Sequence, residues 1–291
     1  MPTLRQINRR IKSVESTAKT TRAMSLVAGS KMRRAQQTAL AHRPYADQLI
    51  ALLKDVVESL RSVESAEGGA LHPLLEPREV KTTGLLLITP DRGLCGGLNT
   101  SLFRAAGAYI ASHPNTKLIC VGRKGNDFFR RTRTEIIGSF GRLGDYPSYD
   151  DVRPISHLVM DAYIAGEVDS MVIVYPRFLN TVLQRPELQV LLPGTPPERG
   201  DEAKAVEYIY EPDAETVLAN LMPRYVEIEV YRAVLELAAS YQSAQMVAMR
   251  NATDAALDMI QQLTLVRNKV RQEQITKELL DITGGVEALN K

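Results

Sequence analysis

The chain has 291 residues, of which 44 % are hydrophobic, and its formal net charge is +2. This length accommodates one large or two small domains, and the apolar content suffices for a buried core. We find no run of 18 apolar residues and no apolar signal-peptide core at the N-terminus, so a membrane-spanning or secreted protein is not expected. Trp is absent and aromatic residues make up 5 %, which argues against an aromatic stacking surface for nucleic acid.

The N-terminal residues follow a heptad pattern typical of a coiled coil. Between Thr3 and Arg43, Gly29 is the only glycine or proline. Pro44 lacks an amide donor and is expected to kink or end this helix, with a second helical piece reaching about Leu60. The two predicted rows are Leu4, Ile11, Ala18, Ser25, Met32 and Ala39, and Ile7, Val14, Thr21, Ala28 and Ala35.

The same segment is strongly basic. Residues 1–43 contain ten Lys or Arg residues and a single acidic residue, Glu15. A merely solvated face usually mixes both signs, so the pattern indicates an anionic partner: DNA, anionic lipid or an acidic protein surface. Lipid is disfavoured because the seam is rich in Ala, Ser and Thr and lacks bulky apolar anchors. A basic coiled-coil nucleic-acid-binding protein remains an alternative on charge alone.

The middle of the chain alternates short apolar runs with helical segments, which is typical of a parallel sheet with helices on its faces. Pro-, Gly- and Glu-rich links at 64–79 and 193–202 bound this region. The expected strands are 84–89, 117–121, 135–140 and 169–175, followed by a closing hairpin of 182–185 and 187–192, and the expected helices are 98–112, 122–131 and 155–165.

The first expected strand is followed by DRGLCGGLN, residues 91–99. This stretch matches neither the dinucleotide fingerprint nor the phosphate loop, so its glycines are interpreted as a tight strand-to-helix turn. A nucleotide-dependent enzyme built on the α/β domain is the second alternative. The four His are scattered, which gives no support for a metal site or a catalytic triad. We therefore predict no catalytic, metal-binding or cofactor-binding residues. Cys95 and Cys120 are interpreted as small buried residues, and Asp150 and Asp151 as caps of the following helix.

The C-terminal region predicts a single long helix. From Arg224 to Thr283 the chain contains neither Gly nor Pro, and 60 helical residues would span about 90 Å. This helix is expected to pack against the N-terminal one and to project beyond it. Its predicted rows are Ile228, Leu235, Gln242, Met249, Ala256, Leu263 and Val270, and Tyr231, Ala238, Gln245, Ala252, Met259 and Val266.

Four segments of the chain resemble the gamma-subunit family of F-type ATP synthases. They are LRQINRRIKSVESTAKTTRAMSLVAGSKMRRAQ (4–36), PDRGLCGGLN (90–99), YIYEPDAETVL (208–218) and MVAMRNATDAALDMIQQLTLVRNKVRQEQITKELLDITGG (246–285). The segments occur in the family's order and cover most of the chain. The resemblance implies a long antiparallel coiled coil with an inserted Rossmann-like α/β domain, which agrees with the pattern analysis. The expected domains are 1–64, 80–195 and 208–291.

The resemblance also implies a function and partners. In this family the coiled coil turns inside a ring of three alpha and three beta subunits, while the base joins the epsilon subunit and the membrane c ring. Proton flow turns the shaft, and the catalytic residues belong to beta. We therefore expect a non-catalytic subunit at the cytoplasmic face of a bacterial plasma membrane, with no nucleic-acid partner. No inserted regulatory cysteine loop is evident, so control by thiol oxidation is not expected.

The resemblance assigns contact residues position by position. The catalytic-ring contacts correspond to Met24, Lys31, Arg92, Lys269, Arg271, Gln272, Thr276 and Glu278. The contacts with epsilon and the c ring correspond to Tyr208, Tyr210, Glu211 and Asp213.

Overall fold

The computed structural model describes residues 3–64, 72–194 and 210–289. It divides into two compact units, with boundaries between Ala28 and Gly29 and between Gln245 and Met246. Helices α1 (Leu4–Glu64) and α5 (Ala214–Leu289) contribute to both units. We call residues 3–28 and 246–289 the helical unit, and the described residues between 29 and 245 the α/β unit.

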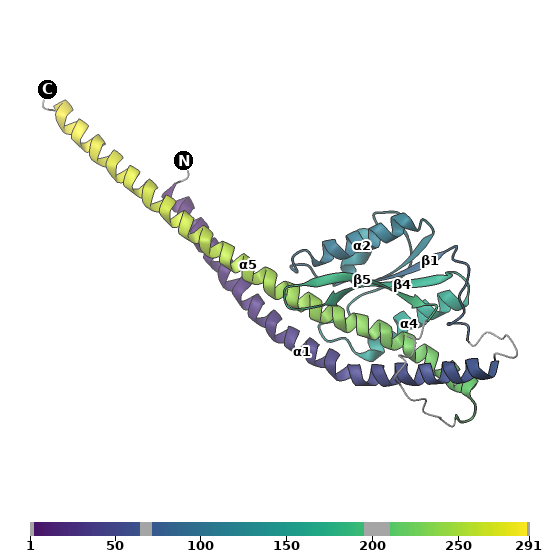
Figure 1. Ribbon diagram of the computed structural model, residues 1–291. Coiled ribbons are helices and arrows are strands. Elements are labelled where there is room, and N and C mark those ends of the chain that lie inside the picture. Colours follow the sequence, from purple (N-terminus) through teal and green to yellow (C-terminus); the bar gives the residue numbers. More distant parts are fainter. Residues whose placement is uncertain (1–2, 65–71, 195–209, 290–291) are drawn as a thin grey trace. The chain divides into compact units, whose positions relative to one another are not determined.

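In the helical unit, α1 and α5 run antiparallel and side by side (Figure 1). The Thr21 and Thr253 hydroxyls lie 2.7 Å apart, and the Ser25 hydroxyl donates to the Met246 carbonyl at 3.1 Å. Both predicted rows of α1 are confirmed here, because their members are buried or half-buried while the residues between them are largely exposed. Small side chains in the seam allow the two backbones to approach closely.

The predicted register of α5 is half right in this unit. Met249 and Ala256 of the first row are buried, and Leu263 and Val270 are half-buried. The second row is wrong by one residue, since Met259 is 47 % exposed and Val266 is 45 % exposed. Their places in the seam are taken by Thr253, Ile260 and Arg267, at least half-buried. The periodicity favoured the apolar Met259 and Val266, whereas the polar Thr253 and the charged Arg267 take seam positions in the structure.

The α/β unit contains a five-stranded sheet in the order β3-β2-β1-β4-β5. Strands β1 to β4 pair in parallel, and β5 pairs antiparallel to β4. This confirms the predicted α/β class. The strands are β1 (Thr83–Ile88), β2 (Thr116–Val121), β3 (Glu135–Phe140), β4 (Ser170–Phe178) and β5 (Gln184–Leu192), and the intervening helices are α2 (Leu98–Ser112), α3 (Arg123–Phe129) and α4 (Tyr149–Ile164).

The two faces of the sheet bury different partners. Alternate residues of the central strands point to opposite faces, so Leu85 and Leu87 pack with α2, while Leu86 and Ile88 pack with α4 and the two long helices. Figure 1 shows α2 on one side of the sheet and α4 with α5 on the other. The larger core therefore joins α1 and α5 to the α/β domain.

Helix α1 continues through Pro44 to Glu64, so of the two expected outcomes, a kink or an end, the end is wrong. Two other local predictions are wrong. Helix α4 begins at Tyr149, six residues before the predicted start, and runs through Pro154, because Ser148 and Asp151 form a capping box there. The predicted closing hairpin is a single strand, β5, and the hairpin is formed by β4 and β5. The predicted domain limits at 195 and 208, and parts of both predicted links, lie outside the described residues.

Candidate functional site

Most of the predicted ring contacts lie in the helical unit. Met24 is half-buried on α1, whereas Lys269, Arg271, Gln272, Thr276 and Glu278 are all exposed on α5. At ~3.6 residues per turn, residues 269, 272 and 276 share one face of α5, whereas residues 271 and 278 lie about 100° or more around the helix from it. The structure therefore places these five exposed side chains on two separate faces of α5.

Several of these side chains have partners within their own helix. Lys269 lies 3.9 Å from the Glu273 carboxylate, an exposed pair at i, i+4. The Thr276 hydroxyl donates to the Gln272 carbonyl at 2.9 Å, and Glu278 accepts from the Gln274 amide at 3.2 Å. Exposed pairs of this kind contribute at most about 1 kcal/mol, so they leave the groups available to another molecule.

The last described part of α5 has no covering helix. The register set by Thr21 and Thr253 places Leu4 beside Val270, both half-buried. Every described side chain from Arg271 to Gly285 is exposed, including Leu279, Leu280 and Ile282. The predicted projection of α5 beyond its partner is thus confirmed. Apolar side chains exposed along a helix indicate a surface for another molecule.

The α1 part of the helical unit carries unpaired positive charge. Its six basic residues are exposed, and none of them forms an ion pair within the described part of the chain. A short acidic segment of a partner would neutralise only part of this positive charge. An extended acidic surface would therefore complement it best. The residues are Arg5, Arg9, Arg10, Lys12, Lys19 and Arg22.

Lys31 and Arg92 lie apart from this surface, in the α/β unit. The Lys31 ammonium forms an ion pair with Asp145 at 2.7 Å, with both side chains about 30 % exposed. The Gln242 amide nitrogen donates to the other Asp145 oxygen at 3.3 Å, while the buried Gln242 Oε1 has no partner among the described residues. The structure thus places Lys31 in a contact within the chain.

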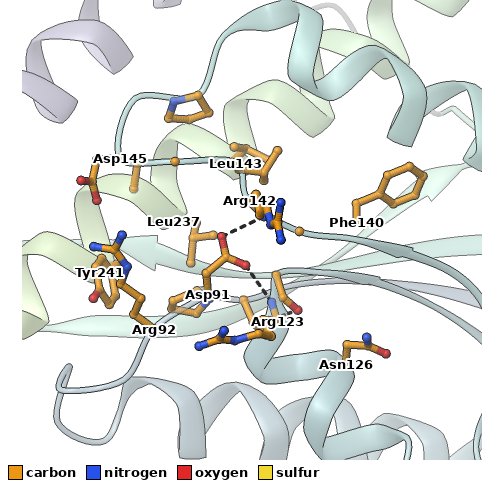
Figure 2. Close-up of a pocket in the computed structure, with 18 of the residues that line it drawn as sticks. Asp91, Arg92, Arg123, Asn126, Phe140, Arg142, Leu143, Asp145, Leu237 and Tyr241 are labelled. Atoms are coloured by element: carbon orange, nitrogen blue, oxygen red, sulfur yellow. Dashed lines mark hydrogen bonds between the residues drawn. The ribbon is translucent and has the colours of Figure 1, made fainter.

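Arg92 is exposed at the rim of a pocket of about 510 Å³ at the carboxyl edge of β1, β2 and β3 (Figure 2). Asp91, at its centre, accepts hydrogen bonds from the backbone amides of Arg123 and Arg142 at 2.9 and 3.0 Å. The Asp91 carboxylate therefore ties together the loops that follow β1, β2 and β3. Tyr241 of α5 forms one wall, and burial raises the pKa of its hydroxyl.

Two glycines near this pocket allow the backbone to adopt conformations that other residues rarely adopt. Gly96 has a φ of 58°, in the left-handed region that favours glycine. Gly122 has a φ of 91°, and a Cβ there would lie 1.8 Å from the Thr89 carbonyl oxygen. The tight turn between β1 and α2 expected from DRGLCGGLN is confirmed. Within the described residues, no group of three His, Cys, Asp or Glu could hold a metal ion, and no helix is both long and apolar enough to cross a bilayer.

The base of α5 contains the predicted contacts with epsilon and the c ring. Asp213 caps this helix, because its carboxylate accepts from the Thr216 amide at 2.7 Å and from the Thr216 hydroxyl at 2.9 Å. These hydrogen bonds lower the pKa of Asp213. Tyr210 is half-buried against the core and Glu211 is exposed. Tyr208 lies outside the described residues.

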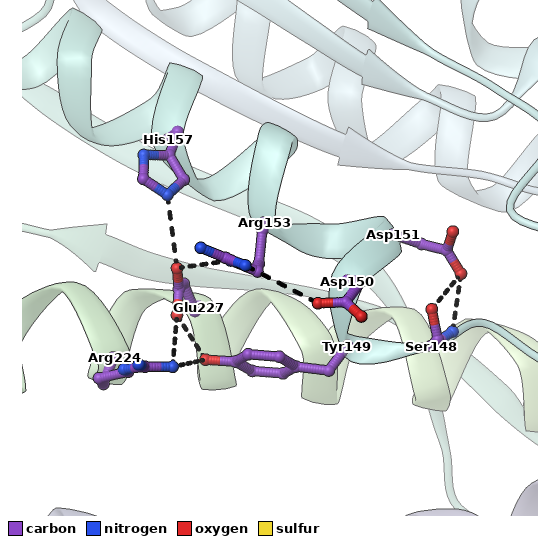
Figure 3. Close-up of polar contacts among 8 residues, drawn as sticks. All are labelled: Ser148, Tyr149, Asp150, Asp151, Arg153, His157, Arg224 and Glu227. Carbon is purple, nitrogen blue, oxygen red and sulfur yellow. Dashed lines mark hydrogen bonds and ion pairs between the residues drawn. The ribbon is translucent and has the colours of Figure 1, made fainter.

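Sequence reasoning missed two acidic groups that organise the α/β unit. Asp145 lies in a loop, where no periodic pattern marks it. Glu227 has a clearer signal, since it interrupts the apolar run Tyr225–Tyr231 on a buried helix, and a buried carboxylate requires partners. Its partners are Tyr149, Arg153, His157 and Arg224 (Figure 3).

Known proteins share this architecture. A family model described as ATP synthase matches residues 3–289. The chain is 50 % identical over 290 residues to the ATP synthase gamma chain of Dehalococcoides mccartyi strain CBDB1, with 99 % of this chain and 100 % of the relative covered. It is 45 % identical to the gamma chain of Desulforamulus reducens, over 99 % of this chain and 100 % of the relative.

Solved structures give the same fold. A central-stalk and c-ring structure of the Tetrahymena thermophila mitochondrial ATP synthase matches with a TM-score of 0.62 and 25 % identity, covering 80 % of this chain and 99 % of that one. A rotor structure of the Euglena gracilis enzyme matches with a TM-score of 0.64 and 18 % identity, covering 94 % and 98 %. A Rossmann-like domain inserted in the chain between two long helices is thus the fold of these rotor subunits.

The sequence comparisons identify the family within this class of rotor subunits. The chain belongs to the ATP synthase gamma-chain family. Neither alternative, a nucleic-acid-binding coiled coil or a nucleotide-dependent enzyme, receives support from these comparisons.

Proposed function

We propose that this chain is the central shaft of an F-type ATP synthase and couples proton flow through a membrane c ring to ATP synthesis or hydrolysis. It is non-catalytic and works at the cytoplasmic face of a bacterial plasma membrane. Its partners are three alpha and three beta subunits around the helical unit, and epsilon and the c ring at the base. Full-length membership of the gamma-chain family is the observation that carries this proposal.

The exposed surfaces of the helical unit suit this role. Shifting a catalytic site between two states from 1:99 to 99:1 requires about 5.5 kcal/mol of differential contact. A single exposed ion pair supplies about 0–1 kcal/mol, so several contacts must share the load. The cationic residues of α1 and the stretch 271–285 of α5, which extends beyond α1, offer such a set in the helical unit.

The assigned contact residues come from the resemblance to the family. We propose that Met24, Lys269, Arg271, Gln272, Thr276 and Glu278 contact the catalytic ring, together with Arg92 at the pocket rim. Lys31 is also assigned to the ring, and it would then exchange or share its Asp145 partner on assembly. Tyr208, Tyr210, Glu211 and Asp213 are assigned to epsilon and the c ring.

Co-expression with alpha and beta subunits tests the proposal. An affinity tag on this chain should recover a 3:3:1 complex that hydrolyses ATP, whereas the chain alone should show no hydrolysis. Replacing Lys31, Arg92 and Arg271 by Glu should lower turnover of the assembled complex several-fold, because like charges would then face the carboxylates of the ring. The matched control is Arg177→Glu, an exposed residue of β4 outside the assigned contacts. Recovery of this chain without alpha and beta would contradict the proposed function.

A further inference from the structure

The loop between β3 and α4, together with the first residue of α4, contacts both long helices. We call these residues, 141–149, the strap. On α1, Asp145 pairs with Lys31 at 2.7 Å, and the Tyr146 ring lies 4.2 Å beneath the Arg34 guanidinium carbon. Lys31 and Arg34 are one turn apart on the helix. Asp145 and Tyr146, two successive residues of the strap, therefore contact two neighbouring basic side chains of α1.

The strap reaches α5 through several different groups. Asp145 accepts from the Gln242 amide at 3.3 Å, and the Pro147 carbonyl accepts from the Tyr231 hydroxyl at 3.4 Å. Tyr149 donates to the Glu227 carboxylate and packs edge-on against the Tyr231 ring, with centroids 5.8 Å apart. From residue 227 to residue 242 the contacts extend along about 22 Å of α5.

The contact at Glu227 is the most enclosed of these. Its side chain is 6 % exposed, and α4 supplies Arg153 and His157 at 3.9 and 3.6 Å. Arg224, on the same helix as Glu227, lies 3.8 Å away (Figure 3). Burial and the neighbouring carboxylate raise the pKa of Tyr149, which keeps its hydroxyl a proton donor. A buried carboxylate with several partners resists displacement, since removing them would leave its charge uncompensated.

These contacts differ in kind from the apolar core beneath them. Hydrophobic packing is non-directional and opposes sliding or rotation weakly. Charge-assisted hydrogen bonds have preferred distances and angles, so they fix one helix position relative to another. Other polar contacts from the sheet, such as Ser240 to the Pro176 carbonyl at 2.9 Å, hold α5 alone. The strap holds α1 and α5 to the same short segment.

We propose that the strap is a torsional linkage, in which Asp145, Tyr146 and Tyr149 position both long helices and carry torque between the α/β domain and the helix pair. The inference rests on the proposed function as a shaft. Torque applied at the base loads the strap sideways, and its contacts share this load between the two helices. Weakening them should make the shaft more compliant and allow ATP hydrolysis without full proton transport.

The test uses the assembled, membrane-bound complex with Asp145→Asn/Tyr149→Phe, which removes one charge and one hydroxyl at nearly constant volume. The control is Arg177→Ala, which breaks an ion pair with Glu187 at 3.1 Å inside the sheet. Two quantities are measured: ATP-driven proton uptake per ATP hydrolysed, and the angular fluctuation of a bead on the shaft of an immobilised complex. The double variant should pump at least twofold fewer protons per ATP and fluctuate at least twofold more, while the control matches the unaltered complex.

A second variant guards against misfolding of the first. Tyr146→Ala alters an exposed ring and should shift both quantities in the same direction by a smaller amount, while Tyr146→Phe should restore them, because the face over which Arg34 lies is kept. Proton uptake and fluctuation equal to the control in both variants would overturn the linkage and leave the proposed function intact. Failure of the unaltered chain to form a coupled complex would overturn both.

Discussion

The α/β unit and the helical unit are stabilised by different interactions. The α/β unit buries large side chains on both faces of its sheet and satisfies its buried carboxylates internally. The helical unit is a two-helix seam of small and β-branched residues, with one hydroxyl pair at its centre and no covering layer. A chain that must hold one end rigid and present the other to changing partners needs this contrast.

Core truncation should give the largest difference between the units. Ile155 is fully buried between α4 and the sheet, and Ile155→Ala should lower the free energy of unfolding by about 2–5 kcal/mol. The matched change Leu279→Ala, at a side chain that is 59 % exposed, should change it by less than about 0.5 kcal/mol. Urea unfolding followed by circular dichroism measures both. Equal losses would show that the tip of α5 is packed in solution.

Alkaline pH should ionise tyrosines outside the helical unit, because all 11 tyrosines lie between residues 45 and 241. Burial raises the pKa of Tyr175 and of Tyr225 to about 12, against an ordinary value of 10.0. A raised pKa stabilises the folded state below pH 10, and this contribution is lost as the pH rises through 12. Absorbance at 295 nm should show that Tyr175 and Tyr225 are among the last tyrosines to ionise, with loss of tertiary structure. Their ionisation near pH 10 would contradict the described burial.

Removal of the α4 cap should have a moderate effect. The Ser148 amide and hydroxyl both donate to the Asp151 carboxylate, at 2.8 and 2.7 Å, which lowers the pKa of Asp151. Ser148→Ala should therefore cost about 1 kcal/mol of stability. Ser112→Ala is the control and should cost less, because this exposed serine hydroxyl contacts only its local neighbours, the Tyr109 carbonyl and the His113 ring. Thermal unfolding of both variants measures the two losses of stability.

The hydroxyl pair of the helical unit should behave non-additively. Thr21→Val or Thr253→Val alone should cost about 1 kcal/mol, since one buried hydroxyl loses its partner across the seam. The double variant should cost less than either single one, because neither hydroxyl of this pair is then left without its partner. A double-mutant cycle read from urea midpoints gives the coupling. Strict additivity would mean that the two hydroxyls do not interact in solution.

Thiol chemistry should have the smallest effect. Cys95 and Cys120 are buried, free of disulfides and both in the α/β unit. Burial raises the pKa of both thiols, that of Cys120 to about 12, so little thiolate forms at neutral pH. A colorimetric thiol reagent should detect neither thiol in the native chain and both in urea. Rapid labelling without denaturant would indicate an opening of the sheet.

Most of the fold could be predicted from the sequence, for identifiable reasons. Helix α2 and strand β3 were predicted at their observed bounds, because each is a continuous run between turn residues. Pro44 was expected to kink or end the first helix and does not end it, since proline removes one hydrogen bond but long flanking helices and tertiary packing keep the helix continuous. The second seam row of α5 was misplaced because the observed row includes Thr253 and Arg267, while the adjacent row of Ala252, Met259 and Val266 is entirely apolar.

The site was less accessible from sequence. The assignment of Lys269, Arg271 and Thr276 as ring contacts came from the resemblance to a family, and these contacts stay predictions. Asp145 and Tyr146 were missed because a loop residue meets its partners only after folding, in this case Lys31 and Arg34, more than one hundred residues away. Long-range polar contacts of this kind leave no periodic trace in a sequence.

The central claim is that the uncovered end of α5 lies inside a catalytic ring. Because the two native thiols are buried, Leu279→Cys introduces a single reactive thiol at the exposed tip. The most direct measurement is its labelling rate in the free chain and in a purified complex with alpha and beta subunits. We predict fast labelling in the free chain and at least tenfold slower labelling in a 3:3:1 complex. Equal rates, with the complex verified, would contradict the account.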